Sequence, residues 1–320
     1  MGVDYGFFDG RLSGLLDYYY EYTYNELLQA YPLSPSSGYS SVIENRGKTR
    51  NEGAEVQLTS YNIKPKSKFQ WKSTINWALN RNKVLDLGGV PQVEGTGPNR
   101  NRAIVGYPAG VYWLAQYAGV DPATGSPLIY DFSGHKVLAT ATTVETYAKP
   151  MGNPYPLFQG GFTNTFSYKG FDLMVLLTYS YGNDIYDDGG KYQSYTLSNY
   201  YNQTTDILAR WQKAGDVTNI PRLSTVNWDN LNMSLFLHDA SYLKVKNIVL
   251  SYHLPQNIVA KMKMRAFRIF ISVQNAATLT PYKGWDPEYN RDNSGAITQG
   301  ASYLGTPQAR TYTLGINFGL

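Results

Sequence analysis

The sequence ends in a stretch of strict alternation, Arg310-Thr-Tyr-Thr-Leu-Gly-Ile-Asn-Phe-Gly-Leu320. Its apolar or aromatic positions are Tyr312, Leu314, Ile316, Phe318 and Leu320. Every residue between them is polar or small, and this period of two predicts a strand with two different faces. One face is bulky enough to meet lipid or a packed core, and the other suits water.

The composition limits the class of protein. Charged residues make up 16% of the 320 residues, whereas about 25% is typical of a soluble domain. The chain also carries 29 Tyr, 12 Phe and 6 Trp. Low charge with many amphipathic rings suits a protein bordered by membrane interfaces. A tyrosine-rich secreted β-sandwich fits the composition equally well.

Several chemistries are absent from the sequence. A net charge of +4, dispersed along the chain, gives no basic patch for nucleic acid. The lack of cysteine excludes disulfides, thiolate metal sites and cysteine nucleophiles. His135, His238 and His253 lie too far apart for a ligand-spaced metal motif. We therefore predict no metal, no cofactor and no catalytic site, and so a protein that is not an enzyme.

Membrane-spanning helices are not predicted either. No apolar run approaches the roughly 18 residues that a spanning helix needs, although strands that are only half apolar could cross. The start, Met1-Gly-Val-Asp-Tyr-Gly-Phe-Phe8, resembles neither part of a signal peptide. We expect the natural start of an exported protein of this kind to lie upstream.

The connections between predicted strands alternate between short and long. Short turns fall at Asp9-Gly10, near Pro65, at Lys169-Gly170 and near residue 259, and long loops cover about 25–50, 86–152, 184–236 and 281–308. The long regions are predicted to be irregular, with one short helix near 206–213. In an antiparallel meander, all short turns then lie at one end. Outer-membrane barrels show this asymmetry, with short periplasmic turns and long extracellular loops, and about nine strands are predicted.

One predicted strand changes phase. Leu243 and Val245 occupy odd positions, but Ile248, Leu250 and Tyr252 occupy even ones. A β-bulge near Lys246-Asn247 would switch the faces; projection of the upper part beyond the bilayer is the alternative.

An ordered series of short motifs covers nearly the whole chain. It comprises Gly10-Arg-Leu-Ser-Gly14, Asp17-Tyr-Tyr-Tyr20, Asn51-Glu-Gly-Ala-Glu-Val56, Gly119-Val-Asp-Pro-Ala-Thr-Gly125, Asn153-Pro-Tyr-Pro156, Gly160-Gly-Phe-Thr-Asn164, Tyr168-Lys-Gly-Phe-Asp172, Gly182-Asn-Asp-Ile185, Arg210-Trp211, Gly215-Asp216, Ser241-Tyr-Leu-Lys-Val-Lys-Asn-Ile248, Gln274-Asn275, Gly284-Trp-Asp-Pro287 and Arg310-Thr-Tyr-Thr-Leu-Gly315. Together they resemble the C-terminal half of the SusC/RagA-type TonB-dependent transporters of Bacteroidota. Each motif is weak alone, and the order is specific.

The resemblance implies an all-β fold and a location in the outer membrane. Residues 1–320 would form the C-terminal portion of a 22-stranded up-and-down transmembrane β-barrel, without the plug domain, TonB box and signal peptide. It implies import of oligosaccharides, or of peptides, together with a SusD-like surface lipoprotein and with TonB, which acts through the missing N-terminal part. The sequence departs from the family by ending on Leu320, where an aromatic residue is usual.

Candidate site residues are aromatic side chains outside the predicted spans: Tyr112, Trp113, Tyr117, Trp211, Trp228, Tyr282 and Trp285. Such rings stack on the apolar faces of sugars, or they pack loops together. Strand residues on the outward phase, Tyr18, Tyr20, Trp71, Trp77 and Tyr179, are predicted to form interfacial girdles that meet membrane lipid.

Two acidic segments are predicted to be turns. Asp187-Asp188 is predicted to be a solvated turn, since neighbouring carboxylates point apart, and Asp121-Pro-Ala-Thr-Gly125 fits a β-turn. A second function stays open at this point: a soluble or surface-attached carbohydrate-binding or adhesin β domain without transport.

Overall fold

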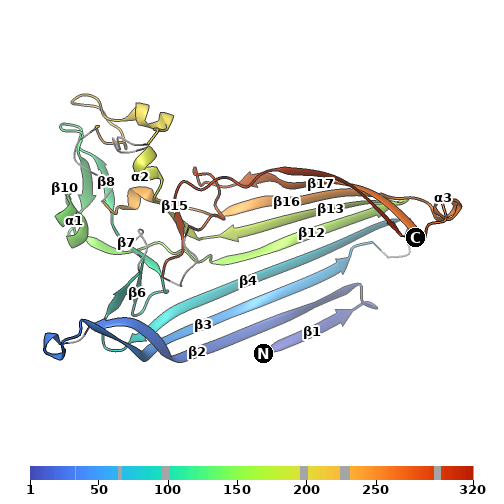
Figure 1. The fold of residues 1–320 in the computed structure, drawn as a ribbon, viewed down its shortest axis with the longest axis horizontal. Coiled ribbons are helices and arrows are strands. Elements are labelled where there is room, and N and C mark those ends of the chain that lie inside the picture. Colours follow the sequence, from blue (N-terminus) through green and yellow to red (C-terminus); the bar gives the residue numbers. More distant parts are fainter. Residues whose placement is uncertain are drawn as a thin grey trace.

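The protein consists of a large β-sheet with a compact group of short elements at one end (Figure 1). The computed structural model describes residues 1–32, 34–63, 67–95, 101–194, 201–223, 231–291 and 297–319, and only the backbone for 28–32 and 41. We call the large sheet the wall. Its nine strands are β1 (Gly2–Phe7), β2 (Leu12–Pro32), β3 (Ser41–Tyr61), β4 (Phe69–Leu87), β12 (Phe158–Tyr168), β13 (Phe171–Tyr181), β16 (Tyr242–His253), β17 (Ala266–Leu279) and β19 (Thr311–Gly319).

The wall strands follow one another in sequence order, and all neighbours are antiparallel. This confirms the predicted meander of about nine strands. The Asp9-Gly10 and Lys169-Gly170 turns are tight, because Asp9 and Lys169 adopt positive φ of 56° and 48° before glycines at 80° and 86°. Helix α3 (Gln256–Lys261) makes the turn near 259. The turn near Pro65 lies partly outside the described residues.

The register of the wall sorts its side chains onto two faces. Along β19, Leu314 lies opposite Ile271 of β17, which in turn lies opposite Leu250 of β16. The predicted girdle residues Tyr18, Tyr20, Trp71, Trp77 and Tyr179 share this same face, which we call the outer face. The inner face carries mostly polar or small residues such as Asn76, Thr178 and Thr313.

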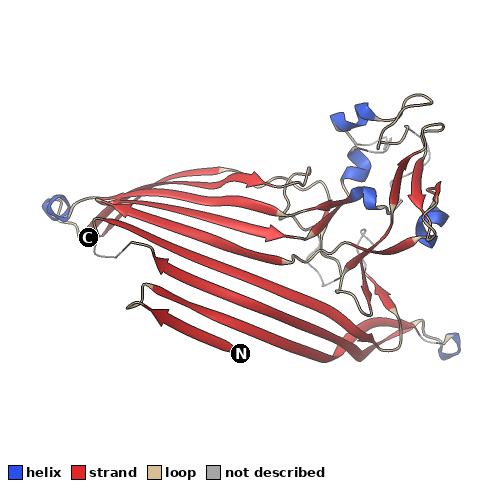
Figure 2. Cartoon of the chain, turned by 180° about the vertical axis from the view of Figure 1, so that it is seen from behind, coloured by secondary structure: helices blue, strands red, loops and turns tan. Residues whose placement is uncertain are grey.

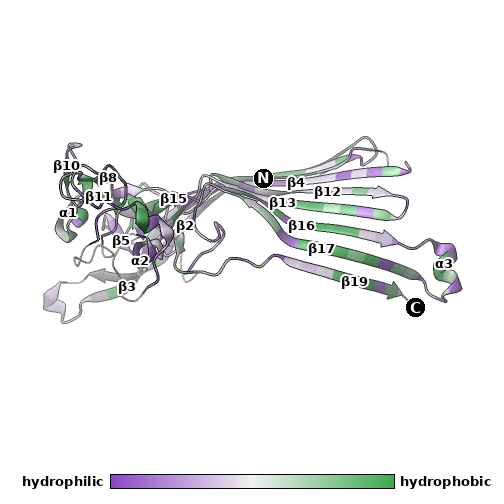
Figure 3. Cartoon of the chain, turned by 90° about the horizontal axis from the view of Figure 1, so that it is seen from above, coloured by the Kyte–Doolittle hydropathy of each residue, from purple (hydrophilic) through white to green (hydrophobic). Residues whose placement is uncertain are grey.

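The wall is a single curved layer. Figures 1 and 3 show it from two perpendicular directions, and the strands spread out in both views. Among the described residues, no second sheet covers the outer face, where Leu16, Leu250 and Ile271 are exposed. A β-sandwich would bury such a face inside a core, so the sandwich arrangement does not fit.

The phase change in β16 is a β-bulge. The pairing with both neighbours shifts between Val245 and Asn247, leaving Lys246 unpaired. Below the bulge Ile248, Leu250 and Tyr252 point outward, and above it Val245 and Leu243 do the same. The bulge predicted near Lys246-Asn247 is therefore confirmed.

The predicted long loop at 25–50 is wrong. Strand β2 continues to Pro32 and β3 resumes at Ser41, so a hairpin extends well beyond the predicted strand ends and closes through a short 3₁₀ turn, η1 (Pro35–Ser37). Apolar alternation fades there because both faces of the extension meet water. Hydrogen bonding between strands does not require that alternation, so the strand persists after its sequence signal ends.

The remaining elements form what we call the head, at the end of the wall opposite α3 (Figure 2). Its elements are β5 (Gln92–Glu94), β6 (Asn101–Ile104), β7 (Val111–Ala115), β8 (Tyr117–Val120), β9 (Pro127–Tyr130), β10 (Lys136–Leu138), α1 (Ala141–Thr146), β11 (Ala148–Met151), β14 (Asp184–Asp187), α2 (Gly190–Gln193), η2 (Thr205–Ala209), η3 (Ser234–Phe236), β15 (Leu237–Asp239) and β18 (Ala301–Ser302). They build three small sheets, β10-β9-β8, β11-β7-β6-β5 and β15-β14-β18.

The head corrects the expectation that residues 86–152 are irregular. Seven short strands and one helix lie in the described part of this range, and each is too short to show periodicity. The helix predicted near 206–213 is a 3₁₀ helix at Thr205–Ala209. The Asp121 turn is confirmed, since its carboxylate accepts hydrogen bonds from Ala123 N at 2.9 Å and Thr124 Oγ1 at 2.6 Å. In the described part of the chain, no helix is long and apolar enough to cross a membrane.

Candidate functional site in the head

Tyr112 is the central packing residue of the head. It is fully buried in an apolar cluster with Leu114, Ile129 and Phe236. Its hydroxyl lies 2.9 Å from the carbonyl oxygen of Asp184 and 2.8 Å from that of Gly300. Because its ring is enclosed on both faces, Tyr112 holds the three sheets together and presents no stacking surface.

Trp113, Tyr117 and Trp211 are half-buried and join segments that are distant in sequence. The Arg102 guanidinium lies 4.6 Å from the centre of the Trp113 ring. The Tyr117 hydroxyl donates to Asn219 O at 2.9 Å, and Trp211 Nε1 donates to Pro122 O at 3.0 Å. The polar groups of Tyr117 and Trp211 and the ring of Trp113 are therefore in contact with other parts of the head. Trp228, also a candidate, lies outside the described residues.

Tyr282 and Trp285 meet at a pocket of about 300 Å³ between two loops of the head. The opposite side comes from the β14–α2 segment, and the pocket is lined by Asp187, Gly189, Gly190, Gln193, Ser194, Thr204, Asp206, His238, Tyr282, Lys283, Gly284, Trp285, Ser302 and Leu304. Trp285 is 67% exposed, whereas Tyr282 is 4% exposed. Of the described candidates, Trp285 offers the most open ring.

The polar groups of this pocket are tuned by burial. Burial raises the pKa of the Asp187 carboxyl, opposed by the hydrogen bond from Gly190 N at 3.0 Å. Burial, with Lys283 nearby, lowers the pKa of His238, so its imidazole is neutral near pH 7. Burial raises the pKa of Tyr282 to about 12. The pocket thus combines an open indole with hydrogen-bonding groups, which suits a ligand rich in hydroxyl or amide groups.

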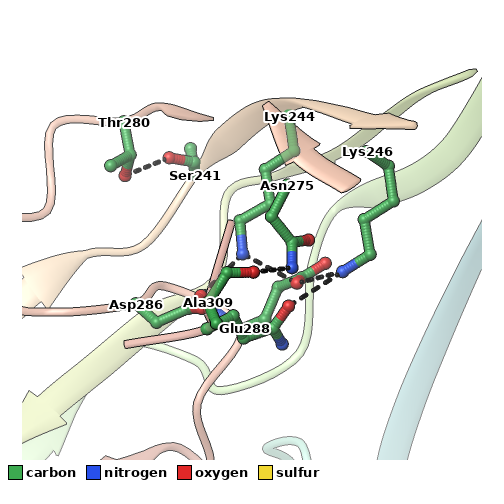
Figure 4. Close-up of polar contacts among 9 residues, drawn as sticks. Ser241, Lys244, Lys246, Asn275, Thr280, Asp286, Glu288 and Ala309 are labelled. Carbon is green, nitrogen blue, oxygen red and sulfur yellow. Dashed lines mark hydrogen bonds and ion pairs between the residues drawn. The ribbon is translucent and has the colours of Figure 1, made fainter. Parts of the chain in front are cut away.

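A buried ion-pair network anchors the loop that carries Tyr282 and Trp285 (Figure 4). Lys244 Nζ, on the inner face of β16, lies 2.6 Å from Asp286 Oδ1 and 2.7 Å from Glu288 Oε2. Lys246, displaced by the bulge, reaches the same Glu288 oxygen at 2.9 Å. The Lys244 side chain is only 4% exposed. We call these four residues the anchor; they fix the pocket loop to the wall.

Sequence reasoning missed the anchor, although its parts were visible. Lys244 and Lys246 alternate in a strand, and two carboxylates follow Trp285 closely in sequence. Their separation of about forty residues left no local signal that they meet.

The predicted solvated turn at Asp187-Asp188 is wrong. Asp188 is 2% exposed and pairs with Lys191 Nζ at 2.9 Å and Arg291 Nη1 at 3.0 Å. Lys191 also donates to Asn232 Oδ1 at 3.0 Å. The two loops at 184–236 and 281–308 are therefore tied together by a buried ion cluster, which the local sequence could not show.

No family model matches the chain, but curated proteins do. The TonB-dependent receptor P3 of Formosa agariphila is 31% identical over 347 aligned residues, which cover 99% of this chain and 33% of that protein. The TonB-dependent receptor SusC of Bacteroides thetaiotaomicron is 26% identical over 99% of this chain and 31% of its own length. The chain is homologous to the SusC/RagA-type TonB-dependent receptors.

Solved structures agree with this assignment. The RagAB peptide transporter superposes with a TM-score of 0.85 at 24% identity over all of this chain and 34% of that one. The RagAB peptide importer in its closed-closed state gives 0.81 at 25% identity, over all of this chain and 35% of that one. The chain thus spans about a third of the length of the receptors it matches, and the wall is an all-β, antiparallel part of a receptor barrel.

In the part of the chain that the structure describes, no group of three or more His, Asp or Glu side chains could hold a metal ion. The features of the head that suit a ligand are the pocket and the exposed indole ring of Trp285.

Proposed function

We propose that this chain is the C-terminal portion of the barrel of a TonB-dependent outer-membrane transporter, which imports oligosaccharides, or peptides, together with a SusD-like surface lipoprotein. The observation that carries the proposal is the single-layered wall, whose apolar outer face is left uncovered by the described residues. Lipid is the environment that stabilises such a face without a second sheet. Residues 1–320 would supply strands and outer loops, while the plug and TonB box would lie outside these residues.

The position of the head supports an extracellular role. All head segments connect wall strands at the end opposite the tight turns. Long loops mark the extracellular end of outer-membrane barrels. The pocket beside Trp285 would then face incoming substrate, and its indole would stack on a sugar face or on a peptide side chain. One structural neighbour, RagAB, is a peptide transporter, and this supports keeping both substrate classes.

The partner proposal rests on exposed apolar side chains of the two joined loops. Leu208 is 67% exposed, Val217 is 96% exposed and Trp285 is 67% exposed. Substitution of Leu208→Asp with Val217→Asp in the complete receptor should reduce co-purification of the SusD-like lipoprotein. Phe8→Asp, at a 74% exposed position in a tight turn at the far end of the wall, is the control. Equal recovery in both variants would contradict the partner surface.

Transport is tested by uptake in cells that carry the complete receptor. We expect one member of a panel of fluorescent oligosaccharides and peptides to accumulate, and a protonophore to abolish its uptake. Trp285→Ala should reduce uptake without lowering the amount of folded barrel, because the exposed ring contributes little to packing. If no probe enters in a protonophore-sensitive way, the transport proposal fails. An adhesin without transport predicts surface binding only.

A further inference from the structure

The outer face of β4 ends in two cations immediately above its aromatic and aliphatic positions. Outward positions run from Phe69 to Leu79 and then continue with Arg81 and Lys83. Ten residues of strand rise about 33 Å, and a tilt of about 40° reduces this to about 25 Å, the height of a barrel's apolar band. Arg81 and Lys83 therefore lie where lipid headgroups begin, at the head end of the wall (Figure 1).

The neighbouring strand adds a third cation to the same face. Arg50 of β3 lies opposite Lys83, and Glu52 lies opposite Arg81. The Arg50 guanidinium lies 5.9 Å from the centre of the Tyr20 ring and 3.4 Å from the Glu52 carboxylate. Three cations thus share the patch with one carboxylate, and Lys48, two residues from Arg50 on β3, is paired with Asp86 at 3.1 Å.

Two of these cations keep most of their hydrogen-bonding capacity. Arg81 is exposed, and its Nη1 donates to Leu157 O at 3.1 Å. That bond uses one of the five N–H groups of the guanidinium. Lys83 is also exposed. On β13, β16 and β17, residues exposed near the head end of this face are apolar or aromatic, namely Tyr181, Leu243 and Leu279.

We propose that Arg50, Arg81 and Lys83, with Tyr20 beside them, bind the phosphate group of a lipid in the leaflet at the head end of the wall. This rests on the proposed function, since only a membrane-embedded barrel brings headgroups to this face. Guanidinium groups bind phosphate oxygens in pairs, and an ammonium adds a point charge. Tyr20, 57% exposed, lies level with Arg81 across β3, because both residues pair with Glu52. An amphipathic ring suits the boundary between acyl chains and headgroups.

The experiment uses the complete receptor in nanodiscs of phosphatidylcholine doped with diphosphorylated lipid A, with retained lipid counted by native mass spectrometry. Arg81→Gln with Lys83→Gln should weaken lipid A retention about thirtyfold, from the effect of two basic residues at an anionic surface. The matched control is Lys136→Gln with Lys213→Gln, two exposed cations of the head, which should retain lipid A as the wild type does. Arg81→Lys with Lys83→Arg keeps the charge and should restore retention.

The outcomes separate this proposal from the function on which it rests. If the wild-type receptor inserts and the variant with Arg81→Gln and Lys83→Gln retains as much lipid A as the wild type, only the lipid site is overturned. A receptor that stays soluble without detergent overturns both proposals. Dephosphorylated lipid A should be retained as weakly by the wild type as by the variant. If free inorganic phosphate displaces lipid A completely at equal concentration, the site is a phosphate site and not a lipid site.

Discussion

The wall and the head place their apolar side chains in opposite ways. The wall leaves Leu250, Ile271 and Leu314 exposed on one face of a single layer, whereas the head buries Tyr112, Leu114 and Phe236 completely. The head is therefore held by a core and by buried ion pairs, as a soluble domain is. The wall is held by hydrogen bonds between its strands, and its apolar outer face needs lipid to cover it. The head and the wall are thus stabilised by different interactions, and the anchor joins the two regions.

The largest effect is expected at the anchor. Lys244→Met would leave Asp286 and Glu288 facing each other without their buried cation, and breaking such a pair costs about 3–5 kcal/mol. The loop at 281–308 should then become sensitive to a protease added outside intact cells.

Lys246→Met provides the matched control for the anchor. The Lys246 side chain is 32% exposed, so water replaces part of its ion pair with Glu288, and the loop should stay resistant to the protease. Equal sensitivity of the two variants would show that burial of Lys244 is not what holds the loop.

A charge on the outer face of the wall should have the next largest effect. Leu314→Arg places a guanidinium in hydrocarbon at a cost of about 2–4 kcal/mol near the bilayer midplane. We expect less heat-modifiable barrel in the outer membrane. Thr313→Arg points into the lumen and should be tolerated. A spin label at 314 should be relaxed by a lipid-soluble quencher and a label at 313 should not; the opposite result would reverse the two faces.

In the head, removal of a tyrosine hydroxyl should cost more stability in the core than at the rim. Tyr112→Phe removes the hydroxyl whose single proton is shared by the carbonyl oxygens of Asp184 and Gly300, at a cost of about 1–3 kcal/mol. Tyr117→Phe removes one bond at the rim and should cost about 0.5–1.5 kcal/mol. Thermal unfolding of the head, followed by near-UV circular dichroism, should rank the variants in this order. A larger loss for Tyr117→Phe would place the centre of the head elsewhere.

The smallest effect is a pH dependence from His238. Its pKa is lowered on folding from the model-peptide value of 6.5, so below that pH the unfolded chain binds a proton that the folded head does not. Stability of the head should therefore rise as pH increases from the folded pKa to about 6.5, and then level off. His238→Gln should flatten this rise. An unchanged slope would assign the dependence to another group.

Sequence patterns were informative where one physical rule acted alone. Alternation of apolar and polar residues predicts about nine strands and the bulge near Lys246, and glycine-containing pairs between alternating segments predict the turns at Asp9-Gly10 and Lys169-Gly170. It fails beyond the bilayer, where both faces of β2 and β3 meet water and the pattern disappears. The strands of the head escape prediction because they are only two to five residues long. The burial of Asp188 escapes it because the partner Arg291 is distant in sequence.

The bulge in β16 also divides one strand into two independently variable halves. Below it, the lipid phase dictates which positions are apolar; above it, the requirement is that Lys244 faces the carboxylates of the anchor. Because the unpaired Lys246 absorbs the change of phase, the upper half can gain or lose contacts with its loop without turning the lower half around. Substitutions in the upper half therefore change contacts with the pocket loop while the outward positions of the lower half keep their phase.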